Sequence, residues 1–178
     1  RRASKLWPLE RFAAVTREVH AATGTRFVCA PAPTDVAPAR AMAAQAGGAI
    51  TVLEGLGLPE LCALLRRAVC FLGIDGGPMH VAGALGTPVC AVYGATNRQW
   101  IGPWGEVAGP DPATGLPRAV VVQAPGAAPE DPTTRSARRR AWTDRTAIEA
   151  IEVPHVRTAL LRAYEPLLRG EVARALAT

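Results

Sequence analysis

The feature that most constrains the fold is a regular alternation of short apolar runs with helical stretches. The apolar runs are of strand length and lie at residues 26–30, 50–53, 69–74, 89–93 and 120–123. One helical pattern lies before the first apolar run, and three more lie between the first four runs; they span about 8–23, 36–46, 59–68 and 78–85. Strands that are apolar on both faces predict a parallel sheet with helices on both sides. We therefore expect an α/β chain with a Rossmann-like, doubly wound parallel sheet.

The last part of the chain departs from this alternation. A Gly- and Pro-rich stretch predicts an irregular, mobile loop over about 95–118. Residues 124–141 contain few apolar side chains and are also expected to be mobile. Thr143 or Asp144 can cap a short helix, and an apolar stripe predicts a final helix over about 153–168.

Length and charge limit the class of protein. With 178 residues, 49% of them hydrophobic, residues 1–178 are expected to form a single domain. The net charge of +5 suits an anionic partner such as nucleotide phosphates, nucleic acid or an acidic membrane surface.

A basic cluster lies late in the chain and comprises Arg135, Arg138, Arg139 and Arg140. It is interpreted as a solvated loop, and the alternative is a contact with anionic lipid headgroups or a phosphorylated acceptor. Apart from nearby Trp142 the cluster lacks aromatic residues for base stacking, so we expect no nucleic-acid partner.

Cysteine usage and hydropathy indicate the compartment. Cys29, Cys62, Cys70 and Cys90 show no C-x-x-C spacing, and we expect buried, reduced thiols and a cytoplasmic protein. No stretch approaches the ~20 apolar residues of a membrane span, and no signal-peptide pattern opens the chain. Because the chain starts at Arg1 without a methionine, we expect a fragment.

A candidate anion site follows the third apolar run. The run ends at Asp75, two glycines follow, and Pro78 suits the first turn of a helix. Ligands of open α/β sheets bind at the carboxyl ends of strands, and free amides at a helix start bind phosphate. Asp75 can accept hydrogen bonds from sugar hydroxyls, with His80 near the same opening. The alternatives are a helix-capping role for Asp75 and a core position for His80.

This segment resembles the signature D-[TS]-G-P-x-H-x-A-x-A-x-G-x-P of glycosyltransferase family 9, the lipopolysaccharide heptosyltransferases. It departs at Gly76, where the family has Thr or Ser, so a hydroxyl for phosphate binding is missing. It also has Gly83 where Ala is common. Further similarities to the family occur in the same order along the chain, at residues 5–12, 57–61, 89–96, 102–103 and 151–156.

The resemblance implies the C-terminal half of a GT-B glycosyltransferase, in which two Rossmann-like domains face each other. The N-terminal acceptor domain with its catalytic base, and the first strand of the donor domain, would lie outside this chain. The implied reaction is inverting, metal-independent transfer from a nucleotide-diphospho-sugar, most commonly ADP-heptose, to a lipid-linked or lipopolysaccharide acceptor. The resemblance implies no cofactor. It implies an enzyme of the cytoplasm, which could bind peripherally to the inner face of the bacterial inner membrane.

Three residues match the positions implied to act in the reaction. Lys5 would reach the donor phosphates and neutralise charge on the departing diphosphate. Asp75 would contact the sugar hydroxyls, and His80 would position the phosphate or the sugar. The plainer interpretation of Lys5 is a surface lysine that precedes a helix.

Five further residues are implied to bind the donor. Gly76, Gly77 and Pro78 would present the helix start to the diphosphate. Leu56 lies where the family contacts adenine, although a loop leucine commonly serves packing alone. Asp35 is a candidate for the acidic residue that binds the ribose hydroxyls.

One other class of function remains as an alternative, and a second class lacks its defining motif. A non-catalytic module that retains the sugar-nucleotide fold would suit the loss of the hydroxyl at Gly76. A dinucleotide-dependent oxidoreductase needs a G-x-G-x-x-G motif after the first strand, and the sequence does not contain one there.

Overall fold

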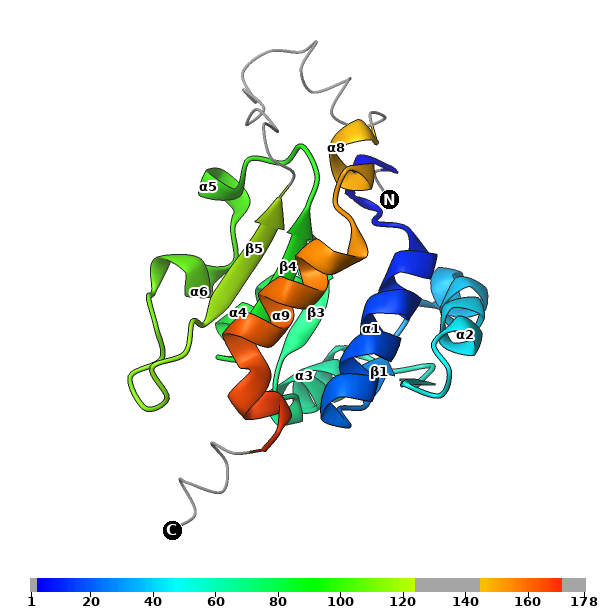
Figure 1. Cartoon of the computed structure of the whole chain (residues 1–178), viewed down its shortest axis with the longest axis horizontal. Helices are drawn as coiled ribbons and strands as arrows, with labels where there is room; N and C mark the ends of the chain where they lie inside the picture. Colours follow the sequence, from blue (N-terminus) through cyan, green and yellow to red (C-terminus); the bar gives the residue numbers. More distant parts are fainter. Residues whose placement is uncertain (1–2, 124–144, 171–178) are drawn as a thin grey trace.

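The computed structural model describes residues 3–123 and 145–170 (Figure 1). The first half contains η1 (Ala3–Lys5), α1 (Leu9–Thr23), β1 (Phe27–Cys29), η2 (Pro33–Asp35), α2 (Val36–Gln45), β2 (Ile50–Val52), α3 (Leu58–Arg67) and β3 (Phe71–Ile74). The second contains α4 (Gly77–Ala84), β4 (Val89–Tyr93), α5 (Arg98–Ile101), α6 (Trp104–Val107), β5 (Ala119–Gln123), α8 (Thr146–Glu149) and α9 (Val153–Leu168). The predicted strands and helices are confirmed, most with bounds within one or two residues.

Strand β4 shows how the two faces of the fold are covered. All five of its residues are buried, and successive side chains point to opposite faces of the sheet. Val89, Ala91 and Tyr93 pack in a cluster with α3 and α4. Cys90 and Val92 pack in the cluster that contains α1 and α9. Helices therefore cover both faces, as a doubly wound arrangement requires.

The strands pair in parallel but form two hydrogen-bonded sheets. One contains β1 and β2, and the other has the order β3-β4-β5. In the common doubly wound strand order 3-2-1-4-5-6, strand 1 lies between strands 2 and 4. The sheets of this chain fit that order when β1 takes position 2 and β3 takes position 4, which leaves position 1 between them. No described residue occupies that position, and Val28 in the middle of β1 is 47% exposed. The predicted parallel, doubly wound arrangement is confirmed, and among the described residues it consists of two hydrogen-bonded sheets because β1 and β3 do not pair with each other.

The segment predicted as an irregular loop over 95–118 is more ordered than its composition suggests. The Asn97 side chain accepts a hydrogen bond from the Gln99 amide and caps α5. Helix α6 packs on α4 and β5, and Pro110 and Pro117 form an antiparallel bridge. The expectation of an irregular loop is therefore wrong for Arg98–Ile101 and Trp104–Val107, which form short helices, while turns and irregular backbone make up most of the remainder. The mobility of this segment stays a prediction. The predictions for 124–141, Thr143 and Asp144 lie outside the described residues.

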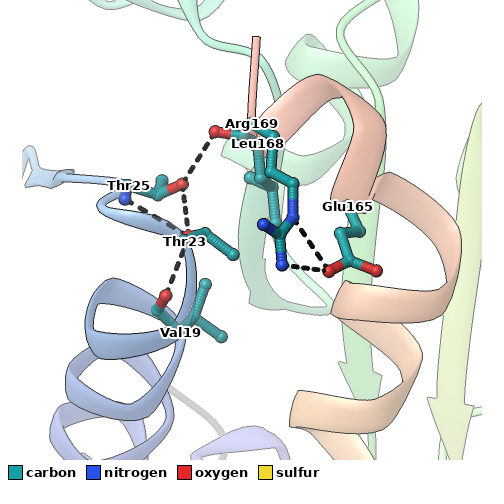
Figure 2. A network of polar contacts seen from close by, with 6 residues as sticks. All are labelled: Val19, Thr23, Thr25, Glu165, Leu168 and Arg169. Atoms are coloured by element: carbon teal, nitrogen blue, oxygen red, sulfur yellow. Dashed lines mark hydrogen bonds and ion pairs between the residues drawn. The ribbon is translucent and has the colours of Figure 1, made fainter. Parts of the chain in front are cut away.

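Helices α1 and α9 lie side by side and are joined at their carboxyl ends. Helix α1 ends at Gly24, whose φ of 73° is a conformation that favours glycine. The Thr23 hydroxyl donates to the Val19 carbonyl at 2.8 Å, and the Thr25 hydroxyl donates to the Leu168 carbonyl at 3.2 Å (Figure 2). These bonds fix the end of α1 against the end of α9.

The cysteines of the chain are all free thiols. Cys90 is fully buried, and burial raises its pKa to about 12. The other three are only partly buried, so the expectation of buried cysteines is confirmed for Cys90 alone. Among the described helices, none is long and apolar enough to cross a membrane.

Candidate functional site

The candidate site is built on the turn between β3 and α4. Gly76 is the residue that precedes the helix, and no side chain caps this end of α4 within the described part of the chain. Pro78 has no N–H, and the amides of Met79 and His80 donate to the Gly76 carbonyl at 3.1 and 3.4 Å. The amides of Gly76 and Gly77 are therefore the groups placed to meet an anion.

The two glycines leave open space at this turn. Gly76 is extended, with φ −171° and ψ 173°, a conformation open to any residue. A β-carbon added at Gly76 would come no closer than 3.9 Å to another atom, and one at Gly77 would meet nothing within 4 Å. The fold itself therefore does not need glycine here, and the missing side chains give a ligand access to the backbone.

Lys5 and Asp75 form an ion pair at the edge of the same turn. The Asp75 side chain is 3% exposed and that of Lys5 is 19% exposed. A buried carboxylate is costly unless a partner compensates its charge, and Lys5 supplies that partner. Lys5 is also the only lysine in the chain. The contact places one ammonium group beside an uncapped helix start, which is an arrangement suited to a diphosphate.

Tyr93 contacts the first turn of α4 through its side chain. Its buried hydroxyl lies 2.7 Å from the Ile101 carbonyl oxygen and 3.3 Å from the Met79 sulfur in the first turn of α4. Burial, and then the negative charge of Asp75, raise the pKa of Tyr93 well above its usual value. The phenol therefore stays neutral at physiological pH and links α4 to the segment after β4.

The backbone around Lys5 is held by contacts that the sequence did not reveal. The indole N–H of the buried Trp7 donates to the Ile151 carbonyl at 2.7 Å, and its ring meets Phe12 edge to face at 4.7 Å. A β-carbon at Gly94 would lie 2.4 Å from the Ser4 carbonyl oxygen, so glycine lets η1 lie directly on the end of β4. The acceptors are backbone carbonyls, which carry no sequence signal.

The remaining predicted residues lie around this turn or in neighbouring loops. His80 is exposed on α4, and Pro78 is exposed in its first turn. Leu56 is partly buried in the loop between β2 and α3. Asp35 is partly buried after β1, and its charge adds to burial in raising the pKa of Cys29. The structure thus brings Lys5 and Asp75 into contact, and the ligand roles of all these residues stay predictions.

Two hollows lie on other parts of the described surface. One of about 250 Å³ is at the opposite, amino end of the strands, bounded by Val69, Pro88 and Arg118 among others. Another of about 300 Å³ lies between α1 and α9. No residue of the turn between β3 and α4 lines either of these two hollows. Within residues 3–123 and 145–170, no group of three or more His, Cys, Asp and Glu side chains could hold a metal ion.

Comparison with known proteins identifies the class. Residues 1–109 match glycosyltransferase family 9 (heptosyltransferase). Two curated relatives from Escherichia coli are both named lipopolysaccharide heptosyltransferase 3. The one from strain K12 is 48% identical over 48 residues, which are 27% of this chain and 14% of the relative. The other is 35% identical over 104 residues, which are 56% of this chain and 30% of the relative. The chain belongs to glycosyltransferase family 9.

Solved structures of the family share the fold. A family 9 glycosyl transferase from Veillonella parvula DSM 2008 matches with a TM-score of 0.68 and 25% identity, over 93% of this chain and 42% of that one. E. coli ADP-heptose lps heptosyltransferase II gives a TM-score of 0.68 and 20% identity, over 94% and 43%. E. coli heptosyltransferase WaaC with ADP gives 0.57 and 25%, over 76% and 39%. The chain spans less than half of each, and the expected α/β, Rossmann-like unit of a GT-B glycosyltransferase is confirmed.

Proposed function

We propose that this chain is the donor-binding unit of a heptosyltransferase and holds a nucleotide-diphospho-sugar, ADP-heptose, at the turn between β3 and α4. The observation that carries the proposal is the Lys5–Asp75 ion pair beside the uncapped start of α4. A structural relative that contains ADP supports the choice of nucleotide.

The geometry suggests how each group acts on the donor. The amides of Gly76 and Gly77 bind the diphosphate, and the Lys5 ammonium neutralises the charge that develops as the nucleotide leaves. Because Asp75 is buried beneath Lys5, its carboxylate holds the ammonium. From this position the ammonium faces the diphosphate, and Asp75 is proposed to accept a hydrogen bond from a sugar hydroxyl.

The acceptor side of the reaction lies beyond this chain in the proposal. The chain spans 42% and 43% of two solved relatives, and the proposal leaves the rest of the reaction to a second domain. We assign to that domain the lipopolysaccharide-type acceptor and the base that deprotonates it for inverting, metal-independent transfer. The enzyme is proposed to work in the cytoplasm, at the surface of the inner membrane where a lipid-linked acceptor resides.

Calorimetry tests the donor site directly. ADP, UDP and GDP are titrated into the chain with a chelator present, and ADP is expected to bind most tightly. His80→Ala should weaken ADP binding by roughly three- to tenfold, the loss of one hydrogen bond or charge contact. The matched control is His20→Ala, since His20 contacts the Thr25 carbonyl at the far end of α1. Equal affinity for ADP in both variants would remove His80 from the site.

A non-catalytic binding or interaction module remains the second candidate. The observation that favours it is Gly76, which lacks the hydroxyl usual at this position. Nucleotide binding separates the donor unit from an interaction module: absence of binding to every nucleotide would favour the interaction module, whereas binding of ADP would exclude it.

A further inference from the structure

We propose that Arg11 is a positioning residue, which holds the segment before α9 in place so that Lys5 stays on Asp75. One guanidinium nitrogen, Nη1, lies 2.6 Å from the Glu149 carbonyl oxygen and 2.6 Å from the Ile151 carbonyl oxygen. Neither resemblance nor pattern in the sequence assigns a role to this arginine, and it lies on α1, outside the turn that binds the donor.

Arg11 binds the carbonyl of the last residue of α8 and a carbonyl in the connection that follows it. Glu149 is the last residue of α8, and the backbone carbonyls at a helix end carry partial negative charge. Hydrogen bonds from a guanidinium are charge-assisted and stronger than neutral ones. The Ile151 carbonyl also accepts from the Trp7 indole, so two side chains from the start of the chain hold the same short connection.

Helix α8 in turn supports the segment that carries Lys5. Ile148 of α8 is fully buried and packs in the hydrophobic cluster that contains α1 and α9. A β-carbon added at Gly94 would lie 3.2 Å from the Ile148 β-carbon and 2.4 Å from the Ser4 carbonyl oxygen, so α8 and η1 both lie against this glycine. Helix α8 and η1 are also in contact with each other. A displacement of α8 therefore shifts η1, whose last residue is Lys5.

The Arg11 bonds lie near the surface, which makes the inference testable. The bond to Glu149 is exposed and that to Ile151 is partly buried. Replacing the guanidinium should therefore loosen the connection without opening a large cavity in the core. Arg17 is a matched control, since this arginine of α1 donates to a backbone carbonyl too, that of Gln45 at 2.9 Å, but it binds no part of α8.

The inference rests on the proposed function, and two measurements separate them. The first is the rate at which a lysine-directed acylating reagent modifies Lys5, followed by peptide mapping without any ligand. Arg11→Gln should raise this rate several-fold, because Lys5 leaves its protected place on Asp75, and Arg17→Gln should leave it unchanged. The second is ADP affinity, which Arg11→Gln should lower about tenfold, the scale for a lost contact to a charged group.

Thermal unfolding of each variant shows that it is folded, and Arg11→Lys, which keeps a cationic donor, should restore much of both properties. A purely structural arginine would lower the melting temperature without changing Lys5 reactivity at a temperature where the protein is folded. If Arg11→Gln matches Arg17→Gln in both measurements while wild-type ADP binding depends on Lys5, the inference is wrong. If Lys5 reactivity rises but ADP affinity does not change, Arg11 positions Lys5 and the proposed function fails instead.

Discussion

The ammonium group of Lys5 lies against the buried carboxylate of Asp75, joining the first described segment of the chain to the end of β3. Lys5 compensates the buried charge of Asp75, so the loss of either partner alone is costly, and it places a cation beside the amides at the start of α4. Structure and ligand binding therefore depend on the same contact, and mutations must be designed to separate the two.

Removing the charge of Lys5 should cost stability as well as ligand binding. Lys5→Met leaves Asp75 buried without its partner and is expected to lower the free energy of unfolding by about 3–5 kcal/mol. The double variant Lys5→Met with Asp75→Asn removes both charges and should recover most of that loss. Urea denaturation checks this, and an equal loss in the single and double variants would contradict the pairing.

A hydroxyl at position 76 should strengthen the anion site. The extended backbone of Gly76 accepts a side chain, and nothing lies within 3.9 Å of a β-carbon there. Gly76→Ser should raise ADP affinity on the order of tenfold through a hydrogen bond to phosphate, and add a few tenths of a kcal/mol as a helix cap. Gly76→Ala supplies the β-carbon without the hydroxyl, and a calorimetric gain equal to that of Gly76→Ser would contradict this explanation.

A side chain at position 94 should push η1 off the sheet. Gly94→Ala brings a methyl group within 2.4 Å of the Ser4 carbonyl oxygen and 3.2 Å of the Ile148 β-carbon. We expect a destabilisation of about 1–3 kcal/mol, the range for overpacking, together with weaker ADP binding. Gly77→Ala, whose methyl group meets nothing within 4 Å, is the stability control. Equal melting temperatures for the two variants would show that η1 does not rest on Gly94.

Much of the fold follows from local signals in the sequence. Helix α1 begins directly after Pro8 and ends at Gly24, as the roles of proline and glycine at helix ends predict. Strand β4 was predictable because all of its residues are apolar and buried. Which strands pair was not predictable, because an apolar run does not indicate its partner strand.

The site was predicted less completely than the fold. Free amides after β3 follow from the Gly-Gly turn, but the role of Lys5 came from resemblance, since one lysine near a helix carries no such information alone. Trp7 and Arg11 were missed as anchors because their partners are backbone carbonyls of a segment distant in sequence. Helices α5 and α6 were missed because Gly and Pro dominate the composition there.

The buried thiol of Cys90 should make stability fall at alkaline pH. In the folded chain burial raises its pKa to about 12, whereas an unfolded cysteine titrates near about 8.5. Above about pH 8.5 the unfolded state therefore loses a proton that the folded state keeps, and stability decreases by at most ~1.4 kcal/mol per pH unit for this group. Urea denaturation between pH 7 and pH 11 should show a shallower decline for Cys90→Ala; an unchanged slope would contradict the assignment.

The most direct test of the donor site uses the single lysine of the chain. An amine-directed reagent is applied with and without saturating ADP, and peptide mapping follows modification of Lys5 separately from that of the terminal amine. If Lys5 contacts the diphosphate, ADP should slow its modification at least several-fold. An equal rate of Lys5 modification with and without bound ADP would contradict the assignment of the site.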